Sequence, residues 1–73
     1  FRNMNEEKLN LSIRKFLKSV GINSQRIIED KIRNLVREGK ISESKSIKFS
    51  ALIKSDDLNL NEEISGVIEV DLD

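Results

Sequence analysis

The segment LVREGKI at residues 35–41 separates two halves of the chain that differ in hydrophobic spacing and in charge. Before it, apolar residues recur at the three- and four-residue spacing of an amphipathic helix; after it, they alternate as in a half-exposed strand. Residues 1–40 contain ten Lys or Arg against five Asp or Glu, and residues 41–73 contain three against eight. The net charge of zero therefore combines a basic helical half with an acidic strand half.

The length of the chain limits how it can be stabilised. We predict one small domain over residues 4–73, with residues 1–3 an upstream remnant before Met4. A domain of this length buries roughly 60% of the surface that its unfolded chain exposes, so its stability is marginal. There is no Cys and no His, which excludes disulfides, thiolate chemistry and imidazole chemistry. Oligomerisation is the remaining means of support.

The composition argues against several classes of function. No apolar run approaches the ~20 residues of a membrane span, and no signal-peptide core follows the basic start. We predict a cytoplasmic protein without membrane association. Only carboxylates, Lys and Ser remain for catalysis, and none stands in a recognisable arrangement. We therefore predict no enzymatic activity, no cofactor and no small-molecule substrate.

Residues 57–62 resemble the start of a calcium-binding loop. Glu62 stands where such a loop needs Gly, and Ile68 stands where it needs a bidentate Glu. The segment is better explained as a polar hairpin loop, and we predict no metal site.

Residues 5–20 are predicted to form the first helix, ending at Gly21. Its apolar residues fall on one stripe: Leu9, Ile13, Phe16, Leu17 and Val20. Gly21 suits the left-handed conformation that commonly follows a helix.

A second helix is predicted from about Ser24 to Glu38, ending at Gly39. Asn23 is its expected N-cap, with Ile22 and Ile27 forming a hydrophobic staple around the cap. Its apolar stripe consists of Ile27, Ile28, Ile32, Leu35 and Val36. Glu29 and Arg33 have the i,i+4 spacing of a stabilising ion pair. The short connection between the two helices predicts a tight helix–turn–helix corner.

The hydrophobic period becomes two from Ile47 onward, which predicts an antiparallel hairpin of two strands. One face carries Ile47, Phe49, Ala51 and Ile53 together with Ile64, Gly66, Ile68, Val70 and Leu72. We prefer the register that pairs Ile53 with Ile64 across a long loop, which leaves a dent at Ala51 and Gly66. A tighter turn at Asp56-Asp57 is the alternative, but it places Glu62 on the buried face opposite Ala51.

The predicted fold is α+β in the order helix, helix, strand, strand, with both helices on one face of the hairpin. A two-stranded sheet is marginal in water, and its unpaired edges invite further pairing. We predict a two-fold homodimer that extends the sheet or packs helices from both chains together. Opposite charges favour contact between the basic helices of one copy and the acidic strands of another.

The helix–turn–helix corner raises nucleic-acid binding as an alternative function. The turn Gly, the flanking apolar residues and a polar start to the second helix fit that motif in part. The predicted contacts to bases or phosphates are Arg14, Lys15, Lys18, Gln25, Arg26 and Arg33. Glu29 and Asp30 lie on the same outward face and would repel phosphate, and no third helix is present. Any two amphipathic helices joined at a Gly share these features.

The pattern S-I-R-K-F-L-K-x-V-G-x-x-S-Q-R at residues 12–26, with the later I-x-G-x-I at residues 64–68, resembles a family of small uncharacterised bacterial proteins. The resemblance extends over most of the chain from Met4 and implies a stand-alone short protein carrying a domain of unknown function. It transfers no substrate, cofactor or catalytic residue. Our hypothesis is a non-enzymatic, homo-oligomeric interaction module, with nucleic-acid binding as the alternative.

Overall fold

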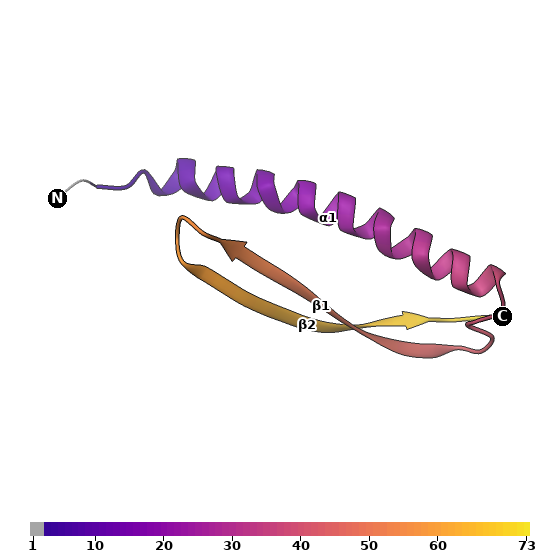
Figure 1. Ribbon diagram of the computed structural model, residues 1–73. Helices are drawn as coiled ribbons and strands as arrows, with labels where there is room; N and C mark the ends of the chain where they lie inside the picture. Colours follow the sequence, from indigo (N-terminus) through magenta and orange to yellow (C-terminus); the bar gives the residue numbers. More distant parts are fainter. Residues whose placement is uncertain (1–2) are drawn as a thin grey trace. The chain divides into compact units, whose positions relative to one another are not determined.

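The computed structural model describes residues 3–73 and consists of one helix followed by two strands (Figure 1). Helix α1 spans Glu6–Arg37, strand β1 spans Lys45–Ser55 and strand β2 spans Leu60–Val70. The chain divides after Lys40 into two compact units, one helical and one a hairpin. The predicted α+β class and the hairpin are confirmed, whereas the predicted number of helices is wrong.

Helix α1 is a single uninterrupted helix of 32 residues. The side chain of Asn5 caps its first turn by accepting a hydrogen bond of 3.1 Å from the backbone amide of Lys8. The break predicted between Gly21 and Ser24 is absent, and so is the helix–turn–helix corner. Asn23 does not cap a second helix; its side-chain amide donates to the carbonyl of Ser19 one turn earlier, at 2.9 Å.

The phase of the apolar residues explains why the helix continues through Gly21. Phe16 and Ile27 are eleven residues apart, as are Leu17 and Ile28, and eleven residues correspond to about three helical turns. One continuous helix therefore keeps these residues of the two predicted stripes in phase. A Gly inside a helix costs about 1 kcal/mol relative to Ala, which is less than the loss of several backbone hydrogen bonds at a corner.

The helix ends as predicted at Gly39, which has a φ of +76°. The amide of Gly39 donates to the carbonyl of Val36 at 3.0 Å, and the amide of Lys40 donates to the carbonyl of Leu35 at 2.9 Å. These two bonds form a Schellman motif, which satisfies carbonyls that the helix end leaves without partners.

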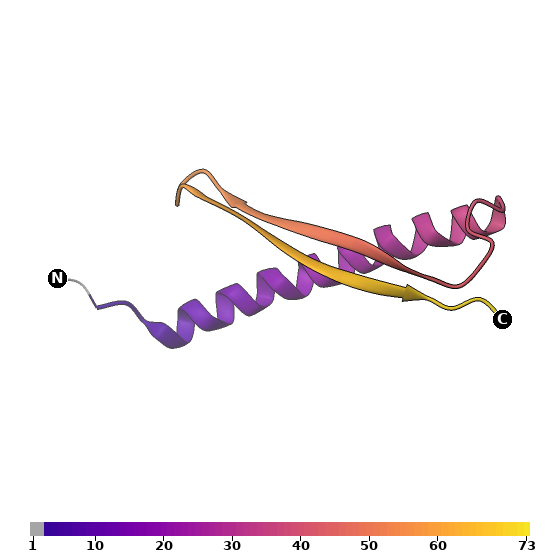
Figure 2. The ribbon, with the colours of Figure 1, turned by 90° about the horizontal axis from the view of Figure 1, so that it is seen from below.

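Strands β1 and β2 form an antiparallel two-stranded sheet, seen from a second side in Figure 2. Both predicted registers are wrong, by two residues in opposite directions, because Ile53 pairs with Glu62. The connection is a four-residue turn, 56–59, rather than the preferred long loop. Asn59 adopts a φ of +51° in this turn, a conformation that Asn tolerates better than most residues.

The faces of the hairpin are nevertheless those predicted, because a shift of two residues keeps every side chain on its side. Glu62 lies on the apolar face but is exposed near the hairpin end, so its charge stays in water. The predicted dent between Ala51 and Gly66 is not formed. Gly66 instead pairs with Phe49, and Ala51 pairs with Ile64.

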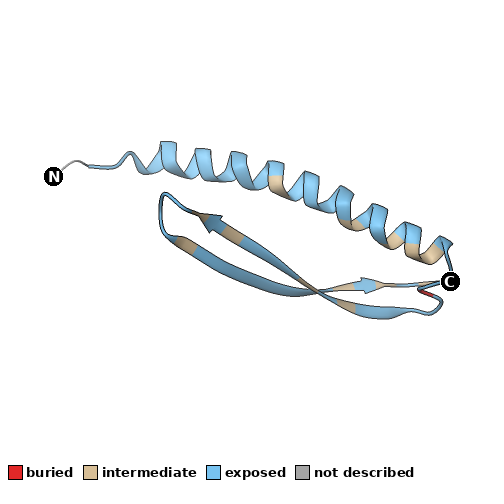
Figure 3. Ribbon diagram, viewed as in Figure 1, coloured by how far each residue is buried: buried red, intermediate tan, exposed pale blue. Residues whose placement is uncertain are grey.

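Within the described range, neither the helix nor the hairpin has a hydrophobic interior of its own. Ile41, at 8% exposure, is the one residue that is buried among residues 3–73. Figure 3 shows this distribution, with most of the ribbon in the exposed class. The apolar residues that periodicity predicted to be core are half-buried or exposed.

Candidate interaction surfaces

The apolar face of α1 is a hydrophobic surface along much of the helical unit. Its exposed members are Leu9 at 39%, Ile13 at 46%, Phe16 at 60%, Leu17 at 48% and Ile27 at 68%. Two half-buried residues, Val20 and Leu35, continue this face. Ile28, Ile32 and Val36 are also half-buried, but they turn progressively away from it around the helix. A helix with such a stripe requires an apolar surface against which to pack.

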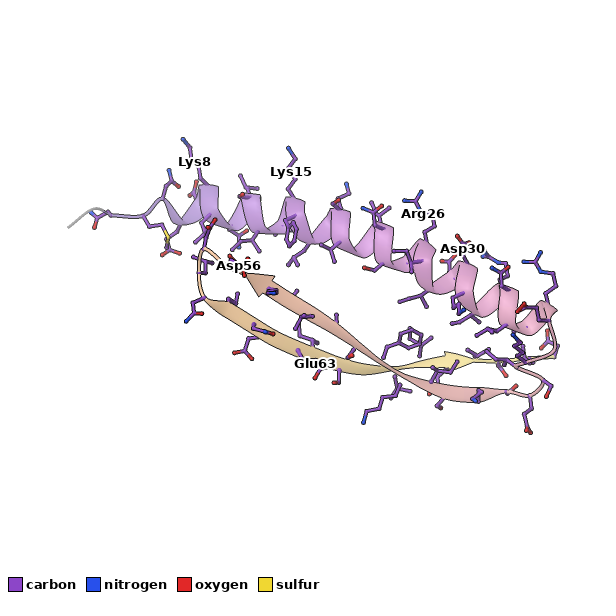
Figure 4. The ribbon with its side chains drawn as sticks, viewed as in Figure 1. Lys8, Lys15, Arg26, Asp30, Asp56 and Glu63 are labelled. Carbon is purple, nitrogen blue, oxygen red and sulfur yellow. The ribbon has the colours of Figure 1, made fainter. Side chains whose placement is uncertain are left out.

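The six residues predicted to contact nucleic acid lie on one helix instead of at a corner between two. At 100° per residue they fall within about one third of the helix circumference, on the side opposite Leu9, Phe16 and Ile27. Figure 4 shows three cations of this side, Lys8, Lys15 and Arg26, projecting in the same direction from α1. We call this surface the basic arc; its members are Arg14, Lys15, Lys18, Gln25, Arg26 and Arg33.

Half of the basic arc is engaged with neighbours on the same helix. Arg33 forms salt bridges with Glu29 at 3.2 Å and with Asp30 at 3.3 Å, and the first of these confirms the predicted i,i+4 pair. The Arg26 guanidinium donates to the side-chain carbonyl of Asn23 at 2.8 Å. In the part of the chain that the structure describes, Arg14, Lys15 and Lys18 form no salt bridge.

Gln25 is also engaged, because its side-chain amide donates to Glu29 at 2.7 Å. This hydrogen bond, followed by the one from Arg33, holds the pKa of Glu29 below its ordinary value. Both bonds favour the charged carboxylate over the protonated acid. The C-terminal part of the basic arc is therefore a self-compensated network, whereas its N-terminal part carries unneutralised positive charge.

The two strands of the hairpin carry opposite charges. Strand β1 contains Lys45, Lys48 and Lys54 and no acidic residue, whereas β2 contains Glu62, Glu63 and Glu69 and no basic residue. Each strand has one neighbour only, so the outer edge of each is unpaired within the two-stranded sheet. Both edges are consequently available to other strands.

Ser44 fastens the open end of the hairpin. Its hydroxyl accepts a hydrogen bond of 2.8 Å from the backbone amide of Leu72. The same hydroxyl lies 3.2 Å from the carboxylate of Asp71 and 3.2 Å from the carbonyl of Leu72, so it can donate to either. Two residues after Ser44 the pattern repeats, because the hydroxyl of Ser46 donates to the carboxylate of Glu69 at 2.7 Å.

The opposite end is the turn at residues 56–59, where Asp56 is labelled in Figure 4. The amide of Leu58 donates to the hydroxyl of Ser55 at 3.3 Å, and the amide of Asn59 donates to the carbonyl of Asp56 at 3.2 Å. These bonds give the turn a defined shape and leave Leu58 73% exposed. The calcium-loop pattern of residues 57–62 is thus divided between a turn and the start of β2.

Residues 3–73 contain no cluster of three or more carboxylate side chains suited to a metal ion. Over the same range, no helix has the length and apolar character needed to cross a membrane. Sequence reasoning did not single out Leu11, which is 65% exposed. Its position outside the apolar stripe was the available signal.

A single capped helix and an open two-stranded hairpin, with several exposed apolar and charged surfaces, define a small α+β chain. No curated protein and no solved structure matches it. The family model DUF6494, described as a family of unknown function, matches residues 4–71. The chain belongs to this family, which confirms the predicted membership of a family of unknown function.

Proposed function

We propose that the chain is a homo-oligomeric interaction module in which the apolar face of α1 is covered on association with a second copy. The observation that carries the proposal is the lack of an interior: Ile41 is the one buried residue within 3–73. The helix has one apolar stripe and the two-stranded hairpin has one narrow apolar face. A chain of this length has little further apolar surface to bury.

The free energy available from the exposed apolar face supports association. About half of each of five large side chains is exposed, from Leu9 to Ile27. At about 1.5–3 kcal/mol for a fully buried side chain, these five contribute about 4–8 kcal/mol per copy. Two copies thus gain an amount comparable to the 4–15 kcal/mol that association costs in lost freedom.

Strand charges favour packing of faces over extension of the sheet in a two-fold dimer. A two-fold axis at a sheet edge places each strand beside its own copy. That arrangement brings the three Lys of β1 together, or the three Glu of β2, and like charges across a strand pair are destabilising. Face-to-face packing avoids this repulsion.

Sedimentation equilibrium of the full chain from micromolar to millimolar concentration tests the proposal. We expect a dimer or larger assembly for the natural sequence. Ile27→Asp should weaken association about 100-fold or more, because both copies of a two-fold interface place a charge in an apolar contact. Ser12→Asp, which adds the same charge to α1 outside the apolar face, should leave association within about threefold. A monomer at every concentration refutes the proposal.

Nucleic-acid binding is the second candidate, and one observation favours it: the six residues of the basic arc share one side of α1. Such binding would rely on contacts to phosphates, because the predicted helix–turn–helix corner is absent. The acidic hairpin unit and the Glu29–Asp30 pair oppose it. Titration against mixed duplex and single-stranded DNA or RNA at low salt should show salt-dependent binding if this candidate is correct, and the absence of binding ends it.

A further inference from the structure

The hairpin tip, which we define as Asp56, Asp57 and Leu58, combines two carboxylates with an exposed leucine. Leu58 at 73% is the most exposed large apolar residue within 3–73. The hydrogen bonds from Leu58 to Ser55 and from Asn59 to Asp56 hold the turn in shape. A fixed, acidic turn carrying an apolar side chain is suited to a surface that is both basic and apolar.

Helix α1 presents such a surface on its polar side. Leu11 at 65% and Ile22 at 59% are exposed there, within one third of the circumference that also holds the unpaired cations. The predicted role of Ile22 as a staple beside an N-cap no longer applies, because the helix continues through Asn23. We define the basic–apolar patch as Leu11, Arg14, Lys15, Lys18 and Ile22.

We propose that the hairpin tip of one copy binds the basic–apolar patch of a second copy. This inference rests on the proposed function, because the occupant is another copy of the same chain. It adds a contact on the side of α1 opposite the apolar face. The tip provides negative charge and the patch provides positive charge, and each offers an exposed apolar side chain to the other.

The dimensions of the two surfaces agree. Lys15 and Lys18 are three residues apart on a helix, which separates their Cβ atoms by about 5–6 Å. Asp56 and Asp57 are consecutive, with Cα atoms about 3.8 Å apart, so each carboxylate can face one ammonium group. Leu11 and Ile22 lie about 16 Å apart along the axis, on either side of the two lysines. Leu58 can therefore contact one of these aliphatic side chains while both carboxylates are paired.

The net charges of the two units also favour this contact. The unit before Ile41 has ten basic and five acidic residues, and the unit from Ile41 onward has three and eight. Copies of the helical unit repel one another, whereas a helical unit and a hairpin unit from different copies attract. A nucleic acid would use the cations of the patch, but it would leave Leu11, Ile22 and the tip without partners.

Reciprocal charge reversal tests this contact. One variant carries Lys15→Glu and Lys18→Glu, and the other carries Asp56→Lys and Asp57→Lys. Each should weaken association about tenfold at about 50 mM salt, measured by sedimentation equilibrium. An equimolar mixture of the two variants should restore the natural affinity to within about threefold, because each tip then meets a patch of opposite charge. Glu43→Lys with Asp73→Lys, the same charge change away from the tip, is the control and should have little effect.

The following outcomes would each refute the tip–patch contact. A natural sequence that is monomeric throughout refutes both the proposed function and this inference. If Ile27→Asp abolishes association but neither charge reversal weakens it, only the tip–patch contact is refuted. Weakening that mixing does not rescue also refutes it, because a contact between copies must recover when complementary variants meet. If the lysine variant weakens association and the aspartate variant does not, the tip–patch contact is also refuted, and the patch is assigned to a different ligand.

Discussion

Gly21→Ala distinguishes the continuous helix from the broken helix that the local sequence predicts. Gly21 lies inside α1, and a Cβ built on it has no atom within 4 Å. Replacing a helical Gly by Ala stabilises a helix by about 0.5–1 kcal/mol, because Ala loses less backbone freedom on folding. For a domain of this length, that gain corresponds to an increase in melting temperature of about 2–8 °C. The assay is thermal unfolding followed by ellipticity at 222 nm, at one fixed protein concentration.

Gly39→Ala is the matched control, because the same substitution should there have the opposite sign. Gly39 has a φ of +76°, and an Ala in the left-handed region costs about 1–2 kcal/mol. If Gly21 ended a helix in the same way, both substitutions would lower the melting temperature. A decrease for Gly21→Ala of the size seen for Gly39→Ala would therefore refute the continuous helix.

Three further predictions concern single contacts. Asn59→Gly should keep or slightly raise stability and Asn59→Val should lower it by about 1–2 kcal/mol, as measured by urea unfolding, because φ is +51° at this position. Ser44→Ala should cost about 0.5–1.5 kcal/mol and increase amide exchange at Leu72, whose backbone amide loses its acceptor. The pKa of Glu29, measured by NMR titration, should lie below its ordinary value and should rise in Gln25→Ala. Because the folded-state pKa is the lower one, this carboxylate stabilises the helix above its unfolded-state pKa, and that stabilisation disappears as the pH falls through the folded value.

The contrast between the two glycines shows what local sequence signals can predict. Gly39 coincides with a change of hydrophobic period from helix to strand, so two independent signals mark the same end. Gly21 is followed by Asn23, a plausible cap, but the apolar period does not change there. The eleven-residue relation between Phe16 and Ile27 keeps the stripe in phase, and this longer-range regularity outweighs the local helix-breaking signal.

The hairpin shows a similar limit for strand pairing. Alternation determines which side chains share a face, so the faces are predicted correctly although the register is not. Register depends on the turn, and here a serine hydroxyl and one asparagine in the left-handed region close it in four residues. Keeping Glu62 off the apolar face is the wrong criterion for choosing the register, because that end of the face remains exposed to water.

For the candidate surfaces, the sequence predicted one local ion pair that the structure contains. Glu29 and Arg33 pair because their spacing on a helix brings them together, whatever the rest of the chain does. Leu11, Ile22 and Leu58 were missed as a set. Their significance depends on exposure and on the continuity of α1, neither of which composition or periodicity reports.

The division of charge between β1 and β2 has a consequence for how this protein would aggregate. Edges of opposite sign join only when β1 of one molecule lies beside β2 of the next, a head-to-tail joint that stays open unless its rotation closes a ring. Each addition presents the same pair of edges again, so growth would produce a ribbon that lengthens one hairpin at a time. Dissolved salt should slow that growth, because it screens the attraction between successive strands.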